Sequence, residues 1–329
     1  MKKVDLTIST INYNVSNELK KCISSFLETY QDPNFTYEWF IFDNNSVAEE
    51  QAKFDELSKK YAEYLELKFI KKKENIGLAV LNSVLNEARG RYWLFLDPDT
   101  WQMGKPIPTL IEFMDSHPNV GISTALQYKP NGKISLRYGH SLNIFKFFIN
   151  GTILGKAIDY FFFSNNITKF IDPHSNILLK ENFQIYTAPL ACTIERMELL
   201  KKDGYIIDPE FSFMLNDLDL CKRVRDKNYK IMIIPSAKIV HYGHSSYKKK
   251  KRSWERMTFL KAIKKYLRKY HKYQFFLYKF LLFCDLIFLI LIKRVLLFIP
   301  IKNRLKNFHY NKDYYNDNLN DTVYFLLRS

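Results

Sequence analysis

The sequence predicts an α/β fold with a mostly parallel sheet flanked by helices, followed by a separate helical segment. Short apolar stretches alternate with helical stretches over the first 127 residues, which is the pattern of right-handed βαβ units. The apolar run Tyr92–Leu96 leads directly into Asp97-Pro98-Asp99, and ligands of open sheets bind beyond the carboxyl ends of the strands. Residues 248–312 contain 19 Lys and Arg against 2 Asp and Glu, whereas residues 1–247 contain 30 and 29. We therefore expect a nearly neutral domain, residues 1–247, and a basic segment, residues 248–329.

The strands are predicted from short runs of apolar, β-branched and aromatic residues that end in polar turns. Their continuous apolar character is typical of strands that are buried on both faces of a sheet. We expect them at Val4–Ile11, Glu38–Phe42, Leu67–Ile70, Tyr92–Leu96, Val120–Gln127, Thr187–Glu195, Lys230–Ile234 and Ala237–Val240.

The helices are predicted from apolar residues at helical spacing. In the first of them, Leu19, Ile23 and Phe26 share one face with Leu27. We expect helices at Asn17–Tyr30, Glu49–Tyr64, Ile76–Ala88, Ile107–Ser116 and Asp217–Asp226. Residues 129–185 have no clear period, so loops and short helices beside the sheet are expected there.

The cysteines and the N-terminus indicate the compartment. Four cysteines are scattered along the chain without metal-binding spacing, which is typical of a reducing environment. The first residues lack the uninterrupted apolar stretch of a signal peptide. We therefore expect the protein on the cytoplasmic side of a membrane.

The Asp97-Pro98-Asp99 sequence has two interpretations. Two carboxylates that leave a strand two residues apart can hold a hard divalent cation, which in proteins also binds substrate phosphates. Asp and Pro are also common in ordinary turns, so the motif by itself does not decide between a metal site and a turn.

The basic segment has a strongly apolar part at residues 275–301, with Lys279, Asp285, Lys293 and Arg294 as its only charges. These four residues fall within one half of a helical wheel, as in a helix that lies in the membrane interface. A single membrane span and a buried core helix are the alternatives; the run Phe280–Ile292 has only 13 residues, whereas a span needs about 20. Because the segment is rich in Phe, Leu and Ile, nucleic-acid binding is not expected.

Several motifs together resemble the family 2 glycosyltransferases, which have a GT-A fold, and in particular their rhamnosyltransferase-like branch. The first four motifs are Ile8–Asn14, Ile41–Ser46, Glu74–Gly77 with Asn82 and Ala88–Gly90, and Phe95–Asp99. Two later motifs are Asp208–Arg223 and the closing element Pro235–Ala237 with His241–Ser245. The resemblance covers residues 4–247 and implies the GT-A fold, a Rossmann-like arrangement.

The resemblance implies roles for the residues at the ends of the strands. Asp99 is the stronger candidate for direct ligation of Mg²⁺ or Mn²⁺, with Asp97 nearer the ribose, a metal-bound water or the metal itself. His241 is a further metal ligand or a diphosphate contact, with a structural role as the alternative. The remaining nucleotide-binding candidates are Asn12, Asn14, Asp43, Asn75 and Gly77. Asp43 would bind the base, although an N-cap or Asx turn explains it as well.

Transfer of a sugar also needs a base that takes the proton of the acceptor hydroxyl. By resemblance this is Asp217, which implies a single-displacement, inverting reaction, with Asp219 as the alternative; a helix cap is the structural interpretation of both. Asn216 replaces an acidic residue of the family motif, so a neighbouring charge that could raise the pKa of Asp217 is missing. Asn228 stands where the family commonly has glycine in a turn, and asparagine tolerates the left-handed conformation.

The sequence thus predicts a metal-dependent, inverting glycosyltransferase at the cytoplasmic face of the inner membrane. Its partners would be a nucleotide-sugar donor, for which dTDP-rhamnose is the candidate, a lipid-linked saccharide of a bacterial surface polysaccharide, and the membrane surface. A UDP-hexose or UDP-galactofuranose donor is the alternative within the same class. A non-catalytic membrane-bound scaffold is the alternative of another class.

Overall fold

The computed structural model describes residues 4–31, 34–135, 144, 148–149, 152–163, 181–243 and 252–298, with side chains of the last two helices at residues 257–291. The polybasic run at 248–251, His244 and Ser245 lie outside the described residues. The chain divides into two compact units, one of residues 1–141 and 178–249 and one of residues 142–177 and 250–329.

The first unit is built on a nine-stranded sheet with the order β3-β2-β1-β4-β8-β6-β9-β5, in which β7 pairs with β9. Parallel pairing joins β3, β2, β1 and β4, and also joins β6 to β9. Antiparallel pairing joins β8 to β4 and β6, and joins β5 and β7 to β9. The strands are β1 (Val4–Asn12), β2 (Tyr37–Asp43), β3 (Leu67–Lys71), β4 (Gly90–Leu96), β5 (Thr100–Met103), β6 (Val120–Tyr128), β7 (Phe183–Gln184), β8 (Cys192–Arg196) and β9 (Lys230–His241).

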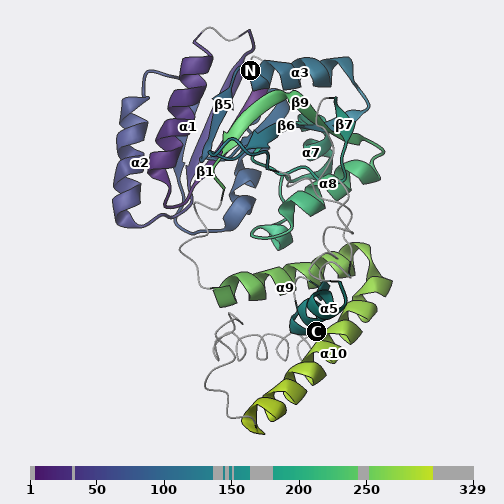
Figure 1. The fold of residues 1–329 in the computed structure, drawn as a ribbon. Helices are drawn as coiled ribbons and strands as arrows, with labels where there is room; N and C mark the ends of the chain where they lie inside the picture. The colour runs from purple at the N-terminus through teal and green to yellow at the C-terminus, as the bar shows by residue number, and fades with distance from the viewer. Residues whose placement is uncertain are drawn as a thin grey trace. The chain divides into compact units, whose positions relative to one another are not determined.

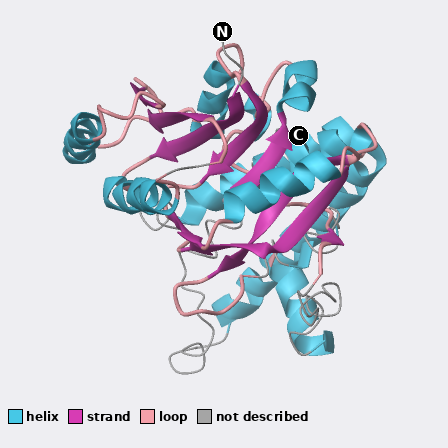
Figure 2. Ribbon diagram, turned by 90° about the horizontal axis from the view of Figure 1, so that it is seen from above, coloured by secondary structure: helices cyan, strands magenta, loops and turns pink. Residues whose placement is uncertain are grey.

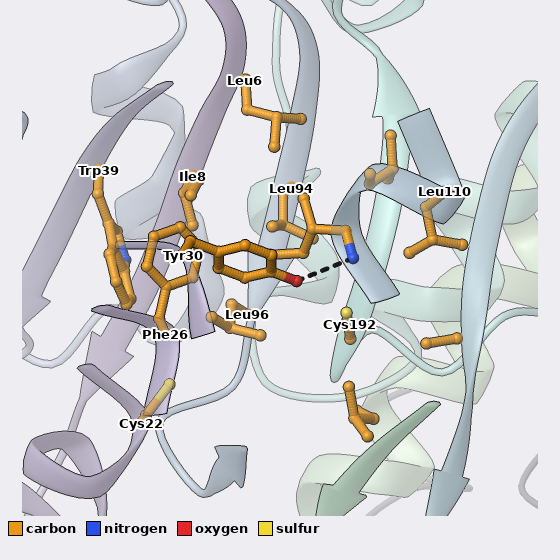
Figure 3. Close-up of a cluster of buried hydrophobic side chains, with 14 of the residues drawn as sticks. Leu6, Ile8, Cys22, Phe26, Tyr30, Trp39, Leu94, Leu96, Leu110 and Cys192 are labelled. Carbon is orange, nitrogen blue, oxygen red and sulfur yellow. Dashed lines mark hydrogen bonds between the residues drawn. The ribbon is translucent and has the colours of Figure 1, made fainter. Parts of the chain in front are cut away.

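Helices cover both faces of this sheet (Figure 2). Successive residues of a strand point to opposite faces, so Leu94 and Leu96 of β4 join one core cluster while Trp93 and Phe95 join the other. On the first face, Tyr30 accepts a hydrogen bond from the Ile107 amide at 3.1 Å (Figure 3). The helical elements are α1 (Ser16–Thr29), α2 (Ala48–Lys60), the 3₁₀ helix η1 (Gly77–Val84), α3 (Pro106–Ser116), α7 (Met197–Asp203), the 3₁₀ helix η3 (Pro209–Phe211) and α8 (Asn216–Asp226).

The predicted α/β class is confirmed, and several elements differ from the sequence prediction. The elements β7, α7 and η3 were not predicted, and the strand predicted at Thr187–Glu195 begins only at Cys192. The stretch predicted as helix 76–88 is the shorter 3₁₀ helix η1, and the amides of its first turn bond to Ser212. The two strands predicted at 230–240 are one strand, β9, in which residues 235–237 bulge from the pairing with β6. Pro235 has no amide to donate, so a bulge tolerates it. Strand β5 was not predicted, because it is short and follows the Asp97-Pro98-Asp99 turn directly.

The second unit contains α5 (Ile153–Phe163), α9 (Arg252–Tyr270) and α10 (Lys272–Phe298), and α10 packs against both other helices (Figure 1). One face of α10 is buried, at Phe275, Tyr278, Leu282, Asp285 and Leu289. The helix predicted from residue 275 is therefore present as far as residue 298. Within it, Lys272–Leu291 is long and apolar enough to cross a membrane, with 28% of that window buried.

Asp285 is oriented differently from the helical-wheel prediction. The wheel groups it with Lys279, Lys293 and Arg294 on one polar half of the helix, but its side chain is fully buried. Its Oδ1 accepts a hydrogen bond from the Leu154 amide at 2.7 Å, close to the start of α5, where helix amides lack partners within the helix. Asp285 therefore joins α10 to α5, and the prediction that it lies on a polar outer surface is wrong.

Candidate functional site

Asp97, Asp99 and His241 meet at the carboxyl end of β4. Thr100 of β5 pairs with His241 of β9, and this antiparallel pairing brings the histidine beside the two carboxylates. His241 Nε2 lies 3.3 Å from Asp99 Oδ1 and 3.5 Å from Asp97 Oδ2. Asp99 is 5% exposed, while the Asp97 side chain is 31% exposed. Asp97 is thus the more accessible of the two carboxylates.

The turn that carries the two carboxylates is held by the backbone. The Asp97 amide donates to the Ala191 carbonyl at 3.0 Å, and the Tyr242 amide donates to the Asp99 carbonyl at 3.1 Å. The Thr100 hydroxyl closes the turn on the Asp97 carbonyl at 2.7 Å. The side chains of both aspartates are therefore presented from a fixed backbone.

Gln127 of β6 orients the histidine, and the sequence prediction missed it. His241 Nδ1 lies 3.1 Å from Gln127 Oε1. In the tautomer with the proton on Nδ1, the Nδ1–H group donates a hydrogen bond to this oxygen, and the lone pair of Nε2 points toward the carboxylates. This tautomer can ligate a metal through Nε2. The signal in the sequence was a glutamine near the end of a mostly apolar strand, and the structure buries this side chain fully.

The three side chains fit a divalent cation. One ligand atom from each of Asp97, Asp99 and His241 lies within 4.8 Å of the others. Two carboxylate oxygens suit Mg²⁺ or Mn²⁺, and the imidazole nitrogen adds a ligand that transition metals accept more readily. A cation held here would supply positive charge to a diphosphate.

The residues predicted to bind the nucleotide lie at the ends of β1 and β2. Asn12 Nδ2 donates to Asp43 Oδ1 at 2.8 Å, and Asp43 Oδ2 accepts from the Ser46 backbone amide at 3.1 Å. Asn14, at φ 60°, accepts from the Val47 amide at 2.8 Å. Asn12 and Asp43 are fully buried. The Asp43 side chain thus closes the turn after β2 through the Ser46 amide, three residues on, and contact with a base stays a prediction.

Asn75 and Gly77 belong to a second loop that joins the first through Asn44. Asn44 Nδ2 donates to Asn75 Oδ1 at 3.0 Å and to the Gly77 carbonyl at 3.1 Å. The Gly77 amide also donates to Asn75 Oδ1 at 3.0 Å. Gly77 has φ +63°, and a Cβ there would lie 2.5 Å from the Ser212 carbonyl oxygen. The close approach that glycine permits is therefore to Ser212, and Asn44 is a further site residue that the sequence analysis did not select.

Asp217 lies at the start of α8. Its Oδ1 accepts from the Leu218 amide at 2.8 Å, and its own amide donates to Asn216 Oδ1 at 2.9 Å. Burial raises the pKa of the Asp217 carboxyl above its usual value. Asn216 offers no negative charge that could raise the pKa of Asp217, but burial of the carboxyl raises it instead. Leu215, two residues before Asp217, has φ 61°, a strained conformation for a bulky residue.

Asp219 has a different environment. It is 1% exposed, and its Oδ2 accepts from Arg223 Nε at 3.0 Å. Arg223 also pairs with Asp203 and donates to the Ile206 carbonyl at 2.7 Å. The carboxylate of Asp219 is therefore engaged in a buried ion-pair network under α8. In the turn after α8, Asn228 has φ 63°, which confirms the left-handed conformation expected there.

Comparison with known proteins decides the family. The family model for glycosyl transferase family 2 matches residues 7–201. The chain belongs to this family. The match ends within α7, so it includes the strands from β1 to β8 and the Asp97-Pro98-Asp99 turn, but not α8 or β9. No curated protein matches the chain.

Solved structures share the GT-A fold of this family 2 protein. GalNAc-T7 with UDP, GalNAc and Mn²⁺ has a TM-score of 0.58 at 13% identity, with 81% of this chain and 48% of that chain covered. The mannosyltransferase PcManGT from Pyrobaculum calidifontis, in complex with GDP-Man and Mn²⁺, has a TM-score of 0.56 at 12% identity, with 99% and 88% covered. S. aureus TarS is 16% identical with a TM-score of 0.48, and the chain spans 38% of its length. The chain thus spans less than half the length of TarS and of GalNAc-T7.

Proposed function

We propose that this family 2 protein is a metal-dependent, inverting glycosyltransferase that uses a nucleotide-sugar donor. The observation that carries the proposal is the group of Asp97, Asp99 and His241 at the edge of the sheet where α/β proteins bind ligands. Two solved structures with the same fold contain a nucleotide or nucleotide sugar together with Mn²⁺. Asp99, Asp97 and His241 would hold Mg²⁺ or Mn²⁺, and that cation would neutralise the charge that builds on the leaving diphosphate.

Asp217 is the proposed base for the acceptor hydroxyl. Its carboxylate accepts a hydrogen bond from the Leu218 amide at the start of α8, whereas Asp219 is paired with Arg223. A raised pKa brings a carboxylate closer to the working pH, which makes it a better proton acceptor. This contrast favours Asp217 over Asp219.

For the donor we propose dTDP-rhamnose, with a UDP-hexose or UDP-galactofuranose as alternatives, bound along Asn12, Asn14, Asp43, Asn75 and Gly77. The acceptor would be a lipid-linked saccharide of a bacterial surface polysaccharide. A thermal-shift screen of these nucleotide sugars with Mn²⁺ identifies the donor, because a ligand that binds only the folded state raises Tm. A shift that appears without metal and persists in Asp99→Ala would contradict the metal site.

The enzyme mechanism is tested with two substitutions. Asp99→Ala and Asp217→Asn should each lower release of the nucleoside diphosphate from the donor, the latter by about 10²–10⁴-fold as expected for loss of a general base. Asp55→Asn is the matched control, because Asp55 is half-exposed and pairs with Lys71 on the surface. Full activity of both site variants would exclude the mechanism, and complete absence of turnover in the wild type with every donor would favour the non-catalytic scaffold.

The second unit supports a place at the membrane. Large apolar side chains are exposed at intervals of three or four residues along α10, on the side away from its buried face. They are Tyr273, Phe276, Leu277, Phe280, Phe283, Ile287, Ile290 and Leu291. The end of α5 adds four exposed aromatic residues at 160–163. A row of this length on a soluble surface is typical of a membrane or partner contact.

The charge of the neighbouring helix favours an anionic bilayer as the occupant of this apolar row. The helix α9, which packs against α10, exposes Lys261, Lys265, Arg268 and Lys269. Basic residues beside an apolar helix face are attracted to the anionic lipids of the cytoplasmic leaflet. Because one face of α10 is packed and Asp285 is bound to α5, we propose that α10 lies in the interface and does not span the bilayer.

Membrane attachment is tested by sedimentation with vesicles that contain anionic lipid. Phe276→Ser and Phe280→Ser together should weaken binding, since these side chains are 68% and 61% exposed. Leu65→Ser is the control, because Leu65 is 86% exposed in the first unit. Unchanged sedimentation of the double variant would exclude this face, whereas resistance of the bound protein to carbonate extraction would favour a span.

A further inference from the structure

Ser212 joins the segment before α8 to the start of η1. Its hydroxyl accepts from the Ala79 amide at 2.9 Å and donates to the Ile76 carbonyl. Its carbonyl accepts from the Leu78 amide at 2.8 Å. We call these contacts the Ser212 clamp. Two of them satisfy amides that the first turn of η1 leaves without partners inside the helix.

The Ser212 clamp is in close contact with the loop that carries the proposed nucleotide residues. A Cβ on Gly77 would lie 2.5 Å from the Ser212 carbonyl oxygen and 2.6 Å from its hydroxyl. The carbonyl of the same Gly77 accepts from Asn44, the neighbour of Asp43. A path of contacts thus leads from the end of β2 to Ser212: Asn44 bonds to the Gly77 carbonyl, and Gly77 lies directly against Ser212.

A second tie lies one turn further along η1. Asn82 Oδ1 accepts from the amides of Ile206 and Ile207, each at 2.9 Å. Asn82 Nδ2 donates to the Ile207 carbonyl at 2.8 Å. Both ends of residues 206–212 are therefore held by η1, and only residues 213–216 separate this anchored segment from Asp217.

The backbone between the clamp and Asp217 is strained. Leu215 has φ 61°, which is unfavourable for a side chain with a Cβ. Such a conformation persists only where the surroundings impose it, and it is concentrated at functional sites. The residue is followed at once by Asn216 and Asp217, so its conformation sets the direction in which α8 begins.

We infer that Ser212 is a positioning residue that fixes the start of α8 through Leu215 and thereby orients the Asp217 carboxylate relative to the nucleotide loop. The inference rests on the proposed role of Asp217. A displacement of a catalytic group by about 1 Å can lower the rate by about 10²-fold. The clamp therefore acts on the rate of proton removal more than on donor affinity.

The test is a double-mutant cycle of Ser212→Ala and Asp217→Asn, read as release of nucleoside diphosphate from dTDP-rhamnose, or from UDP-glucose where that donor gives the larger thermal shift. Ser212→Ala should lower kcat on the order of tenfold and leave the donor KM within about twofold. In the Asp217→Asn background the same change should have little effect, because two residues that act through one group are not additive. Ser83→Ala is the control, since its hydroxyl donates within η1 to Val80.

An equal loss of kcat from Ser212→Ala in both backgrounds would overturn the inference, as would a change in KM alone. If Asp217→Asn by itself has no effect, the proposed base is wrong, which is a separate outcome. Leu215→Gly provides a second variant that relieves the left-handed strain and should raise Tm. We expect it to lower kcat in the wild type and not in Asp217→Asn; full activity of Leu215→Gly would also overturn the inference.

Discussion

Because Gly77 lies directly against Ser212, we expect the substitution Gly77→Ala to lower the free energy of unfolding strongly. Gly77→Ala places a methyl group 2.5 Å from the Ser212 carbonyl oxygen, 2.6 Å from its hydroxyl and 3.0 Å from a Phe213 ring carbon. The residue also has φ +63°, which costs a residue with a Cβ about 1–2 kcal/mol. Because the oxygen at 2.5 Å belongs to the backbone, the 212 segment must move and the clamp must open.

The expected magnitude follows from the bonds that this movement breaks. Two amides, those of Leu78 and Ala79, lose their acceptors on Ser212, at about 1 kcal/mol each. The free energy of unfolding should therefore fall by about 3–4 kcal/mol in Gly77→Ala. The measurement is urea denaturation, with the slope of the transition used to check that both states keep their compactness.

Gly104→Ala is the matched control. Gly104 also has a left-handed backbone, at φ +71°, but a Cβ there meets nothing within 4 Å. Its cost should be the conformational part alone, about 1–2 kcal/mol. Equal losses in the two variants would refute the reasoning, because they would show that Ser212 yields to the added methyl group without cost.

Three further predictions concern single side chains. Burial raises the pKa of Glu195 to about 8 from 4.5. The preference of the folded state for the protonated carboxyl therefore contributes fully to stability below pH 4.5, and this contribution is lost as the pH rises to 8. Between pH 5 and 8 the free energy of unfolding should fall by about 4 kcal/mol more in the wild type than in Glu195→Gln, and parallel curves in chemical denaturation would contradict this. Gln127→Leu removes the partner of His241 Nδ1 and should weaken Mn²⁺ binding about 10–100-fold in calorimetric titration; unchanged affinity would show that Gln127 does not orient the imidazole. Asp285→Leu should lower Tm without increasing vesicle binding, because this side chain faces α5; stronger binding would place Asp285 on the lipid side.

Local patterns in the sequence predicted much of the fold. The apolar runs that end at Asp43 and Leu96 were sufficient to predict β2 and β4, because burial on both faces leaves a run without alternation. Helical spacing in α1 predicted which face packs on the sheet, and Leu19, Ile23 and Phe26 are fully buried there. The position of Asp97 and Asp99 at a strand end followed from the same local information.

Pairing between distant segments was beyond such patterns. The β5–β9 ladder places His241 beside Asp99, and no periodicity predicts which strands become neighbours. The different environments of Asp217 and Asp219 depend on Arg223, one turn along α8, and on Asp203 from another helix. Both aspartates have the same local signature, a carboxylate in a first helical turn, so only the packed structure distinguishes a candidate base from an ion-pair partner.

The sequence by itself determined the α/β class, the carboxylates at the strand ends and the basic, apolar character of the C-terminal segment. Packing between distant segments decided that Gly77 makes room for Ser212 and that Asp285 faces inward. It also set the distances between the two aspartates and His241, which the family resemblance had already suggested as a ligand. The difference arises because sequence patterns depend on residues close together in the chain. Hydrophobic periodicity and residue type report the conformation and the buried face of one segment, whereas a site forms where segments far apart in the chain pack together.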